Sequence, residues 1–259
     1  TTDLRPKQAL ISAGWEDAGH LTESMKEQIL AALPAHEREM RSKGIPTIGS
    51  GLVFPIMEDN LSIEPFAIPN HFARIAALDF GYDHPTAVVW LAWDRDKDIV
   101  YVYDCYSMRK QVPSYHASHI NEREGSEWIP VVWPHDGYQH DKGSGKTLAE
   151  QYREARVNMM PFHFENPPAL GENKGGNSVE PGLMEMLNRM EHGKFKVFNT
   201  LYDWFQEFRM YHRKDGKLVK LRDDLMSATR YATMSLRHST TKNSRWNDKG
   251  RLGPDVAVV

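Results

Sequence analysis

Two strand-like runs that end in an acid constrain this chain more than any other feature of its sequence. The most apolar run, Arg74-Ile-Ala-Ala-Leu-Asp79, ends in a carboxylate, and a second run from Ile129 to Asp136 ends in the same way. A third acidic point, Asp223 and Asp224, begins a helix-patterned stretch near the C-terminus. Carboxylates packed together repel one another and lose water unless a cation holds them. The three acidic points together predict a site for a hard cation.

Asp79 also has a plainer interpretation. The segment from Phe80 to Asp83 has turn character, so the Asp79 side chain could simply cap that turn. The strand that ends at Asp136 is expected to lie next to Asp79, and this proximity favours the metal site. Asp83 and His84 are candidates for orienting a metal ligand or a water, although turn residues describe both equally well.

The chain has 259 residues, a net charge of −3 and the composition of an ordinary globular protein. This charge argues against a uniformly basic DNA-coating surface but permits a local basic groove. The single cysteine, Cys105, cannot form an internal disulfide, which fits a reducing cytoplasm. No segment has the length of a transmembrane helix, and no signal-peptide pattern opens the chain. We therefore expect a soluble intracellular protein without a membrane partner.

Proline and glycine divide the chain into parts. A helix is expected from Thr22 to Ala35, but the closely spaced prolines and glycines from Gly44 to Pro69 exclude long regular elements. We interpret residues 1–70 as a linker or partial subdomain of a longer protein. Residues 239–259 are expected to form a basic, flexible tail, with DNA contact as the alternative.

Residues 71–238 have the pattern of an α/β domain. Alternating apolar residues predict a three-stranded antiparallel meander, and strands that alternate with helices predict parallel additions to it. The expected fold is a mixed five-stranded sheet flanked by helices. Strands are expected at 73–80, 86–93, 99–106, 129–134 and 159–164, with a further short strand at 195–198 and helices at 113–124, 147–156, 181–192, 200–212 and 223–237.

This strand order, with acids after the first and fourth strands and on a late helix, resembles the ribonuclease H-like nucleases. The resemblance implies Mg²⁺ or Mn²⁺ as cofactor, because these ions prefer carboxylate oxygens. Two such ions can activate a water on one side of a phosphodiester and stabilise the leaving oxygen on the other. Asp79, Asp136 and Asp224 would then be the catalytic metal ligands, with Asp223 as the alternative to Asp224.

Helical spacing favours Asp224 over Asp223 as the ligand. One apolar face, with spacings of four, three and four residues, is formed by Leu221, Leu225, Ala228 and Ala232. Asp224 lies at the margin of this face and can lean toward the other acids. Asp223 lies farther round the helix, where a cap or an exposed charge is more natural.

Five segments carry a more specific resemblance, and their order covers nearly the whole chain. They are Trp15–Leu21, Arg38–Pro46, Gly49–Pro55, Leu78–Gly81 with the following Asp-His-Pro-Thr-Ala, and Asp223–Ala232. Together they are similar to the large terminase subunit of tailed bacteriophages. The resemblance implies a nuclease that cuts concatemeric viral duplex DNA in the host cytoplasm and is not part of the mature virion. It also implies an ATPase motor domain elsewhere in the full-length protein, with duplex DNA, the portal and the small terminase subunit as further partners.

Two basic segments are candidates for DNA contact. Gly143-Ser-Gly-Lys-Thr147 is close to a phosphate-binding loop, but His140 stands where that loop needs its first glycine, so ATP binding is not expected. The loop could instead place Lys142 and Lys146 against a DNA phosphate, or it could merely cap the next helix. Arg213 and Lys214 form a second basic turn, with a solvated turn as the alternative.

Three functions remain open from the sequence. A two-metal terminase nuclease is favoured, because the N-terminal segments add to the acid site. A Holliday-junction resolvase or a transposase-like nuclease would carry an equivalent set of acids on the same fold. A catalytically inert docking module of the packaging machine would have no reason to keep a metal site.

Overall fold

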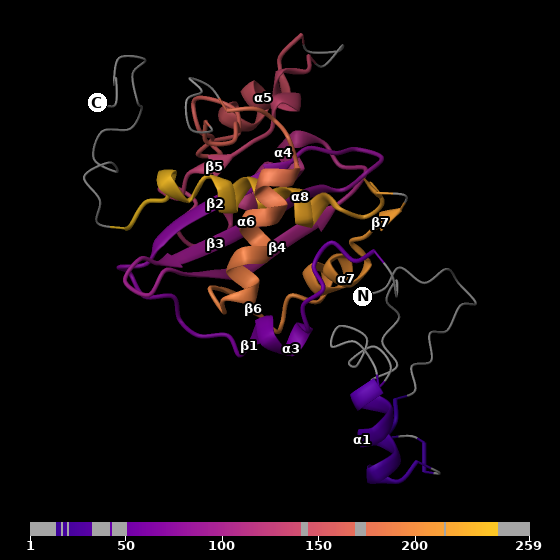
Figure 1. The fold of residues 1–259 in the computed structure, drawn as a ribbon. Coiled ribbons are helices and arrows are strands. Elements are labelled where there is room, and N and C mark those ends of the chain that lie inside the picture. Colours follow the sequence, from indigo (N-terminus) through magenta and orange to yellow (C-terminus); the bar gives the residue numbers. More distant parts are fainter. Residues whose placement is uncertain are drawn as a thin grey trace.

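A six-stranded mixed sheet forms the centre of the molecule (Figure 1). The computed structural model describes residues 14–16, 18–19, 21–32, 42, 51–140, 145–168, 175–214 and 216–242. Within these residues the strand order is β1-β6-β4-β3-β2-β5. The strands are β1 (Ser62–Ile63), β2 (Ala73–Asp79), β3 (Thr86–Asp94), β4 (Ile99–Met108), β5 (Val131–Val132) and β6 (Phe195–Phe198).

The antiparallel meander of β2, β3 and β4 is confirmed. β2 pairs with β3 along its whole length, from Ala73 opposite Trp93 to Asp79 opposite Ala87. β5 extends the sheet parallel to β2, and β6 extends it parallel to β4 on the other side. Most side chains of β2 and β3 are apolar and fully buried, as expected for central strands covered on both faces.

The prediction of a strand at 159–164 is wrong. In that segment Met159 makes only an isolated parallel bridge to Val131. Pro161 has no N–H group to continue a ladder, and the segment is held instead by Trp133, whose Nε1 donates to the carbonyl oxygen of Met160 at 2.7 Å. The second parallel addition to the meander is β6.

The strand β1 makes the sheet one strand larger than expected. It lies within residues 1–70 and pairs in parallel with β6. Val53, Phe54 and Leu61 from the same segment are buried in the hydrophobic core. Part of the expected linker therefore packs against the nuclease-like domain, while the domain boundary near residue 70 stays a prediction.

The helices predicted from periodicity are present, each inside or within one residue of its expected range. They are α1 (Glu23–Ala32), α4 (Pro113–Asn121), α5 (Leu148–Glu154), α6 (Glu180–Glu191), α7 (Tyr202–Met210) and α8 (Asp224–Met234). Short elements complete the described chain, namely α3 (Glu58–Leu61), the 3-10 helices η1 (His135–Tyr138) and η2 (Leu236–His238), and a hairpin of β7 (Arg213–Lys214) and β8 (Lys217–Leu218). In the described residues, none of the helices has the length and apolar character needed to cross a membrane.

The helix α8 positions the site, because it packs across β2 and β3 and carries Asp224 in its first turn and Asp223 at its N-cap. Its Leu225, Ala228 and Ala232 are fully buried, which confirms these three positions of the predicted apolar face. α6 lies over α8 (Figure 1). Gly182 permits this close approach, since a Cβ atom there would collide with the side chain of Arg230.

Candidate metal centre

Three elements bring four carboxylates to one end of the sheet. Asp79 is the last residue of β2, Asp136 lies in η1 just after β5, and Asp223 and Asp224 lie at the start of α8. β2 and β5 are parallel neighbours, so their carboxyl ends lie at the same edge. The acids that the sequence predicted thus lie at the same edge of the sheet.

Asp79 is coupled to all the other acids of this cluster. Burial, followed by the charges of Asp224, Asp223 and Asp136, raises the pKa of Asp79 to about 8. The guanidinium of Arg230 acts in the opposite direction. A carboxylate in these surroundings is unfavourable without a cation, and a divalent cation would reverse that balance.

Asp224 is the more buried of the two adjacent acids. It is 9% exposed, and its Oδ2 atom is buried without a hydrogen-bond partner among the described residues. Burial and the charge of Asp223 raise the pKa of Asp224 to about 6, whereas His84 and Arg109 lower it. A buried carboxylate oxygen without a partner calls for an explanation, and a cation ligand would supply one.

Asp223 occupies the N-cap position of α8, yet its side chain makes no capping hydrogen bond. Burial raises the pKa of Asp223, and the charges of Lys220 and His84 oppose the rise. Its location just outside the helix agrees with the predicted boundary to within a residue. The predicted choice between the two acids is supported by burial but stays a prediction.

The four carboxylates are chemically suitable ligands for a hard cation. The four acids supply only carboxylate oxygens, which Mg²⁺ and Mn²⁺ prefer. Across the described residues, however, no three Asp, Glu, His or Cys side chains stand close enough together to hold a metal ion. Asp136 in particular is exposed and acts on Asp79 through its charge. Metal binding would therefore require the carboxylates to move closer to one another.

Sequence reasoning missed a further acid, Glu207 on α7. Glu207 is 8% exposed, and its Oε2 atom accepts hydrogen bonds from the backbone N–H groups of Leu225 at 2.7 Å and Met226 at 3.2 Å. Burial and the charge of Asp224 raise the pKa of Glu207 to about 8. The carboxyl group thus satisfies two N–H groups at the first turn of α8, which a helix leaves unpaired.

A signal for Glu207 was present in the helical pattern. It lies three residues after Trp204 and directly before Phe208, so it shares the apolar face of its helix. A glutamate on a buried face needs hydrogen-bond partners. Those partners come from α8, and the sequence does not show which helix packs against α7.

Asp83 and His84 lie in the exposed loop between β2 and β3. The charge of His84 lowers the pKa of Asp223 and of Asp224, so the imidazole lies within electrostatic reach of the cluster. Within the described residues, no hydrogen bond or ion pair links Asp83 to the acids.

The predicted DNA-binding cations are mostly engaged elsewhere. Lys146 forms an ion pair with Glu154 at 2.7 Å. Arg213 donates two hydrogen bonds to the carboxylate of Glu180, at 2.8 and 2.6 Å. Lys214 is exposed in β7, and Lys142 lies outside the described residues.

The glycine loop before α5 caps that helix. Thr147 and Glu150 form a reciprocal capping box, in which the Thr147 side chain accepts from the Glu150 N–H at 3.2 Å. The Glu150 carboxylate accepts from the Thr147 N–H at 2.8 Å. For the described part of this loop, the capping interpretation is confirmed.

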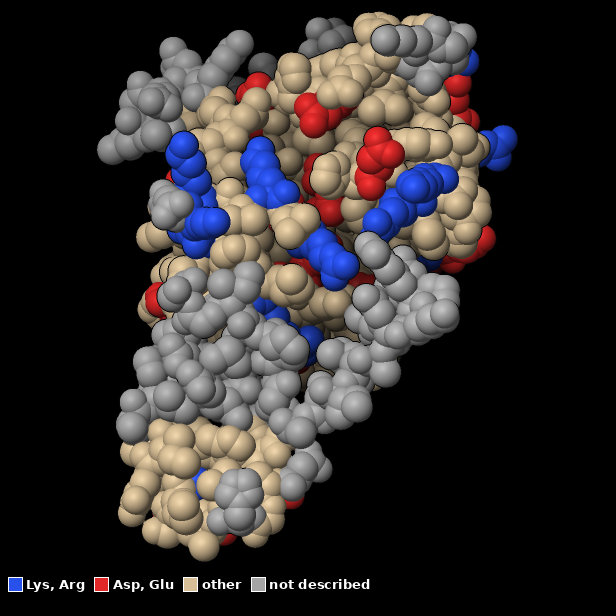
Figure 2. All heavy atoms as spheres, turned by 90° about the vertical axis from the view of Figure 1, so that its right-hand side faces the viewer, with Lys and Arg blue, Asp and Glu red and all other residues tan. Residues whose placement is uncertain are grey.

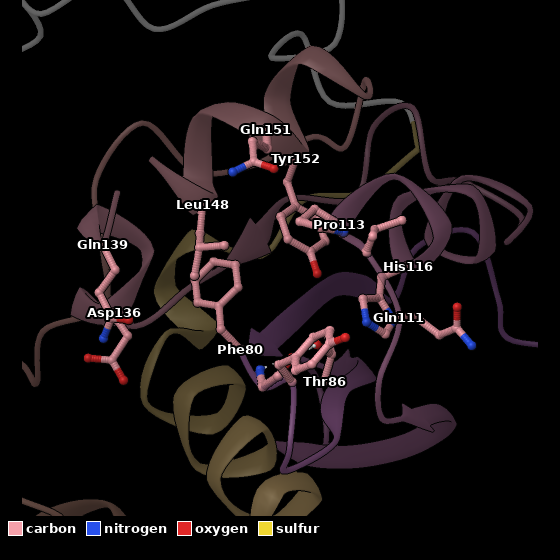
Figure 3. A pocket seen from close by; sticks show the side chains of 13 residues that line it. Phe80, Thr86, Gln111, Pro113, His116, Asp136, Gln139, Leu148, Gln151 and Tyr152 are labelled. Carbon is pink, nitrogen blue, oxygen red and sulfur yellow. Dashed lines mark hydrogen bonds between the residues drawn. The ribbon is translucent and has the colours of Figure 1, made fainter. Parts of the chain in front are cut away.

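Two cavities flank the acid cluster. The first, of about 390 Å³, lies between the β2–β3 loop, α4, α5 and η1. Figure 3 shows Phe80, Tyr152 and His116 around its centre and Asp136 at its side. The second, of about 440 Å³, lies on the Asp224 side and is lined by Pro85, Ser107, Met108, Arg109, Asp203, Gln206, Glu207, Arg222 and Asp224.

Comparison with known sequences identifies close relatives. A family model described as the terminase RNaseH-like domain matches residues 76–236. Large terminase subunits of Salmonella phage P22 and Enterobacteria phage LP7 are each 44% identical to the chain, over 231 and 228 residues. The matches cover 89% and 88% of this chain and 45% and 46% of those proteins, so the chain spans about half the length of these curated relatives.

Comparison with solved structures gives the same result. The nuclease domain of the P22 large terminase is 41% identical with a TM-score of 0.66, covering 74% of this chain and 95% of that domain. The large terminase of a thermophilic bacteriophage is 14% identical with a TM-score of 0.54, covering 86% of this chain and 54% of that protein. This second match shows a shared fold.

Proposed function

The chain belongs to the large terminase family of tailed bacteriophages and contains its ribonuclease H-like domain, and on this premise we propose that it is a divalent-metal-dependent DNA endonuclease. Its substrate is concatemeric viral duplex DNA, which it cuts during genome packaging. The observation that carries this proposal is the position of Asp79, Asp136, Asp223 and Asp224 at one end of the sheet, where burial and the neighbouring charges raise the pKa of Asp79. An inert scaffold gains nothing from four carboxylates that destabilise one another.

Asp79, Asp136 and Asp224 would hold two Mg²⁺ or Mn²⁺ ions, with Asp223 as the alternative to Asp224. When bound, such ions supply Lewis acidity on both sides of the phosphodiester that is cut. The chain itself supplies the placement of the ligands. Glu207 fixes the first turn of α8 through two hydrogen bonds, and His84, whose charge acts on both α8 acids, would orient a ligand or a water.

DNA would approach the face that Figure 2 shows. On this face, Lys and Arg side chains surround a recessed acidic patch. Basic groups around an acidic centre suit a phosphodiester substrate, because the cations attract the backbone while the acids hold the metal. A net charge of −3 is compatible with such a local arrangement.

The wider assignments follow from the family. Because the chain aligns with less than half of each curated large subunit, we place an ATPase motor domain in the rest of the full-length protein. The portal and the small terminase subunit are its assembly partners, and the host cytoplasm is its place of action. The expected absence of ATP binding by this chain itself stays a prediction.

A plasmid-nicking assay tests the proposed function. The chain is expected to nick supercoiled DNA with Mn²⁺ or Mg²⁺, and excess chelator should stop the reaction. Asp79→Asn and Asp136→Asn should abolish nicking and weaken Mn²⁺ binding in calorimetry. Asp96→Asn is the matched control, since Asp96 is an exposed acid in the hairpin at the opposite end of the sheet. Equal nicking in excess chelator would contradict the metal mechanism.

One observation favours a second candidate, the inert docking module. In the described residues, the acids do not form a ready set of three metal ligands. Under this alternative, the folded chain would bind no Mn²⁺ and cut no DNA. Calorimetry with Mn²⁺ on the unaltered chain separates the two functions without relying on a cleavage assay.

A further inference from the structure

We infer that Arg109 and Arg222 form a subsite that holds a backbone phosphate of DNA beside Asp224. The inference rests on the proposed nuclease function and names where the substrate strand is held. Both arginines line the cavity of about 440 Å³ together with Asp224. Their side chains come from distant parts of the sequence, one after β4 and one just before α8.

The cavity has buried acids and exposed cations. Asp224 and Glu207 are 9% and 8% exposed, whereas Arg109 and Arg222 are both exposed. Arg109 and Asp224 line the same cavity, so the cation and the acid face one space. A DNA strand that crosses the opening would therefore meet the guanidinium groups before it reaches the acids.

Both guanidinium groups are available for a ligand. In the part of the chain that the structure describes, neither Arg109 nor Arg222 makes a side-chain hydrogen bond or an ion pair. Neighbouring arginines differ in this respect. Arg209 donates to both carboxylate oxygens of Glu58, at 2.7 and 2.8 Å, and Arg213 is held by Glu180 in the same way.

The backbone at both positions is constrained. Arg222 has a φ of 54°, and Lys110, directly after Arg109, has a φ of 58°. Non-glycine residues rarely adopt this left-handed conformation, and it persists only where the surroundings enforce it. The Lys110 N–H donates to the carbonyl oxygen of Tyr82 at 2.8 Å, which ties the Arg109 loop to the loop that follows Asp79.

The chemistry selects a phosphodiester. A guanidinium group can donate two parallel hydrogen bonds to phosphate oxygens, which a lysine cannot match in geometry. A phosphodiester carries one negative charge, so the acids in the cavity repel it less than they repel a phosphate dianion. The ligand is thus a DNA backbone phosphate rather than free phosphate.

Salt-dependent DNA binding tests this subsite. A fluorescently labelled duplex is titrated with the chain in Ca²⁺ at several NaCl concentrations, and a gel confirms that the duplex stays intact. Removal of one phosphate-binding cation should lower the slope of log K against log[salt] by about 1. Arg109→Ala and Arg222→Ala should each show this decrease, and the double variant should show a decrease of about 2. Arg109→Lys should keep most of the slope but bind more weakly.

The matched control is Arg156→Ala. Arg156 is an exposed arginine just after α5 with a φ of 66°, and it does not line the cavity. The slope of log K against log[salt] for Arg156→Ala should equal that of the unaltered chain. All of these variants should keep the melting temperature, since none removes a side-chain hydrogen bond or ion pair described in the structure.

Several outcomes would overturn the subsite. An unchanged slope in both single variants would do so, and so would a decrease in Arg213→Ala alone, which would place the phosphate at the β7–β8 hairpin. Displacement of the duplex by millimolar inorganic phosphate from the unaltered chain, but not from the double variant, would make free phosphate the ligand. A chain that cuts DNA with unchanged slopes would refute only the subsite. Arginine-dependent binding without any Mn²⁺-dependent cutting would refute the nuclease and retain the subsite.

Discussion

Asp79 is a carboxyl group whose surroundings oppose its ionisation. It ends a buried strand, the charges of Asp224, Asp223 and Asp136 raise its pKa, and the charge of Arg230 lowers it. In the metal-free protein, this group would keep its proton at a pH at which an exposed aspartate has released it. A divalent cation would remove that preference, so metal binding and proton release should be linked.

The first prediction concerns the metal-free protein and pH. The pKa of Asp79 is raised from 3.8 to about 8, so the folded state binds its proton more tightly than the unfolded state does. The contribution to stability is complete below about pH 4 and is lost as the pH rises toward 8. Urea denaturation with chelator should therefore show a free energy of unfolding that falls from pH 5 to pH 8.

Asp79→Asn should remove the part of this dependence that Asp79 contributes, while Glu207 and Asp224, whose pKa values are also raised, should keep the rest. At pH 8 the metal-free variant should be more stable than the unaltered chain by on the order of a few kcal/mol, and the difference should shrink at pH 5. Added Mn²⁺ should stabilise the unaltered chain and leave the variant unchanged. Equal stability of the unaltered chain at both pH values would show that Asp79 is not desolvated in this way.

The second prediction concerns the adjacent acids. Asp224 has the buried, unpartnered Oδ2 atom, and its charge has the largest effect on Asp79 of the charges in the cluster. Asp224→Asn should weaken Mn²⁺ binding by more than about tenfold, and Asp223→Asn should weaken it less. Calorimetry with both variants measures the difference. The reverse order would identify Asp223 as the ligand and give Asp224 a structural role.

At the residue scale, the sequence was informative where an acid stands at the end of an apolar strand, because the cost of burying its charge can be inferred from the sequence alone. Asp79 and Asp136 follow apolar strands, so their place at the edge of the sheet could be predicted from position alone. The roles of Glu207, Arg109 and Arg222 depend on contacts between segments far apart in the chain, which periodicity does not reveal. Leu221 shows a smaller failure of the same kind, because it is 60% exposed and precedes the helix whose apolar face it was expected to join.

At the element scale, α8 decides how the site is built. Its apolar residues pack across β2 and β3 and so fix the position of the helix. Arg222, two residues before α8, has a left-handed backbone conformation, so the residues that precede it do not continue the helix. The sequence predicted the helix and its buried face, because periodicity records both. It predicted the start of α8 to within one residue, but it did not predict that Glu207 from another helix accepts the N–H groups of the first turn.

The third prediction tests that cap. Glu207→Ala leaves the N–H groups of Leu225 and Met226 without their acceptor and should cost about 1–3 kcal/mol of unfolding free energy. Glu207→Gln keeps an acceptor oxygen on a side chain of the same length, so it should lower the free energy of unfolding by less. Hydrogen exchange at these two amides should be faster in the alanine variant than in the glutamine variant. Unchanged exchange in both would show that Glu207 does not hold this turn.

At the scale of the whole molecule, the fold class was predictable and the extent of the domain was not. Strands and helices alternate in a way that few topologies satisfy, so the mixed sheet followed from the order of elements. The extent depends on which parts of the proline-rich segment pack against the core. Phe54 illustrates this, since it lies 2% exposed beside Phe208 and Tyr211, with ring centroids 5.9 and 5.8 Å away.

The last prediction places the functional start of the domain before residue 70. A chain that begins at residue 71 lacks the buried Val53, Phe54 and Leu61, the pairing of β1 with β6, and the two hydrogen bonds from Arg209 to Glu58. Removal of Phe54 alone should cost about 3–5 kcal/mol, as expected for a buried phenylalanine. Thermal denaturation should therefore show a chain starting at 71 to be far less stable than one starting at 51.

The chain starting at 51 is the control, because it retains all of these contacts. Equal melting temperatures for the two would mean that residues 51–70 only cover a domain that is already complete, and the sequence-based boundary near 70 would then be correct.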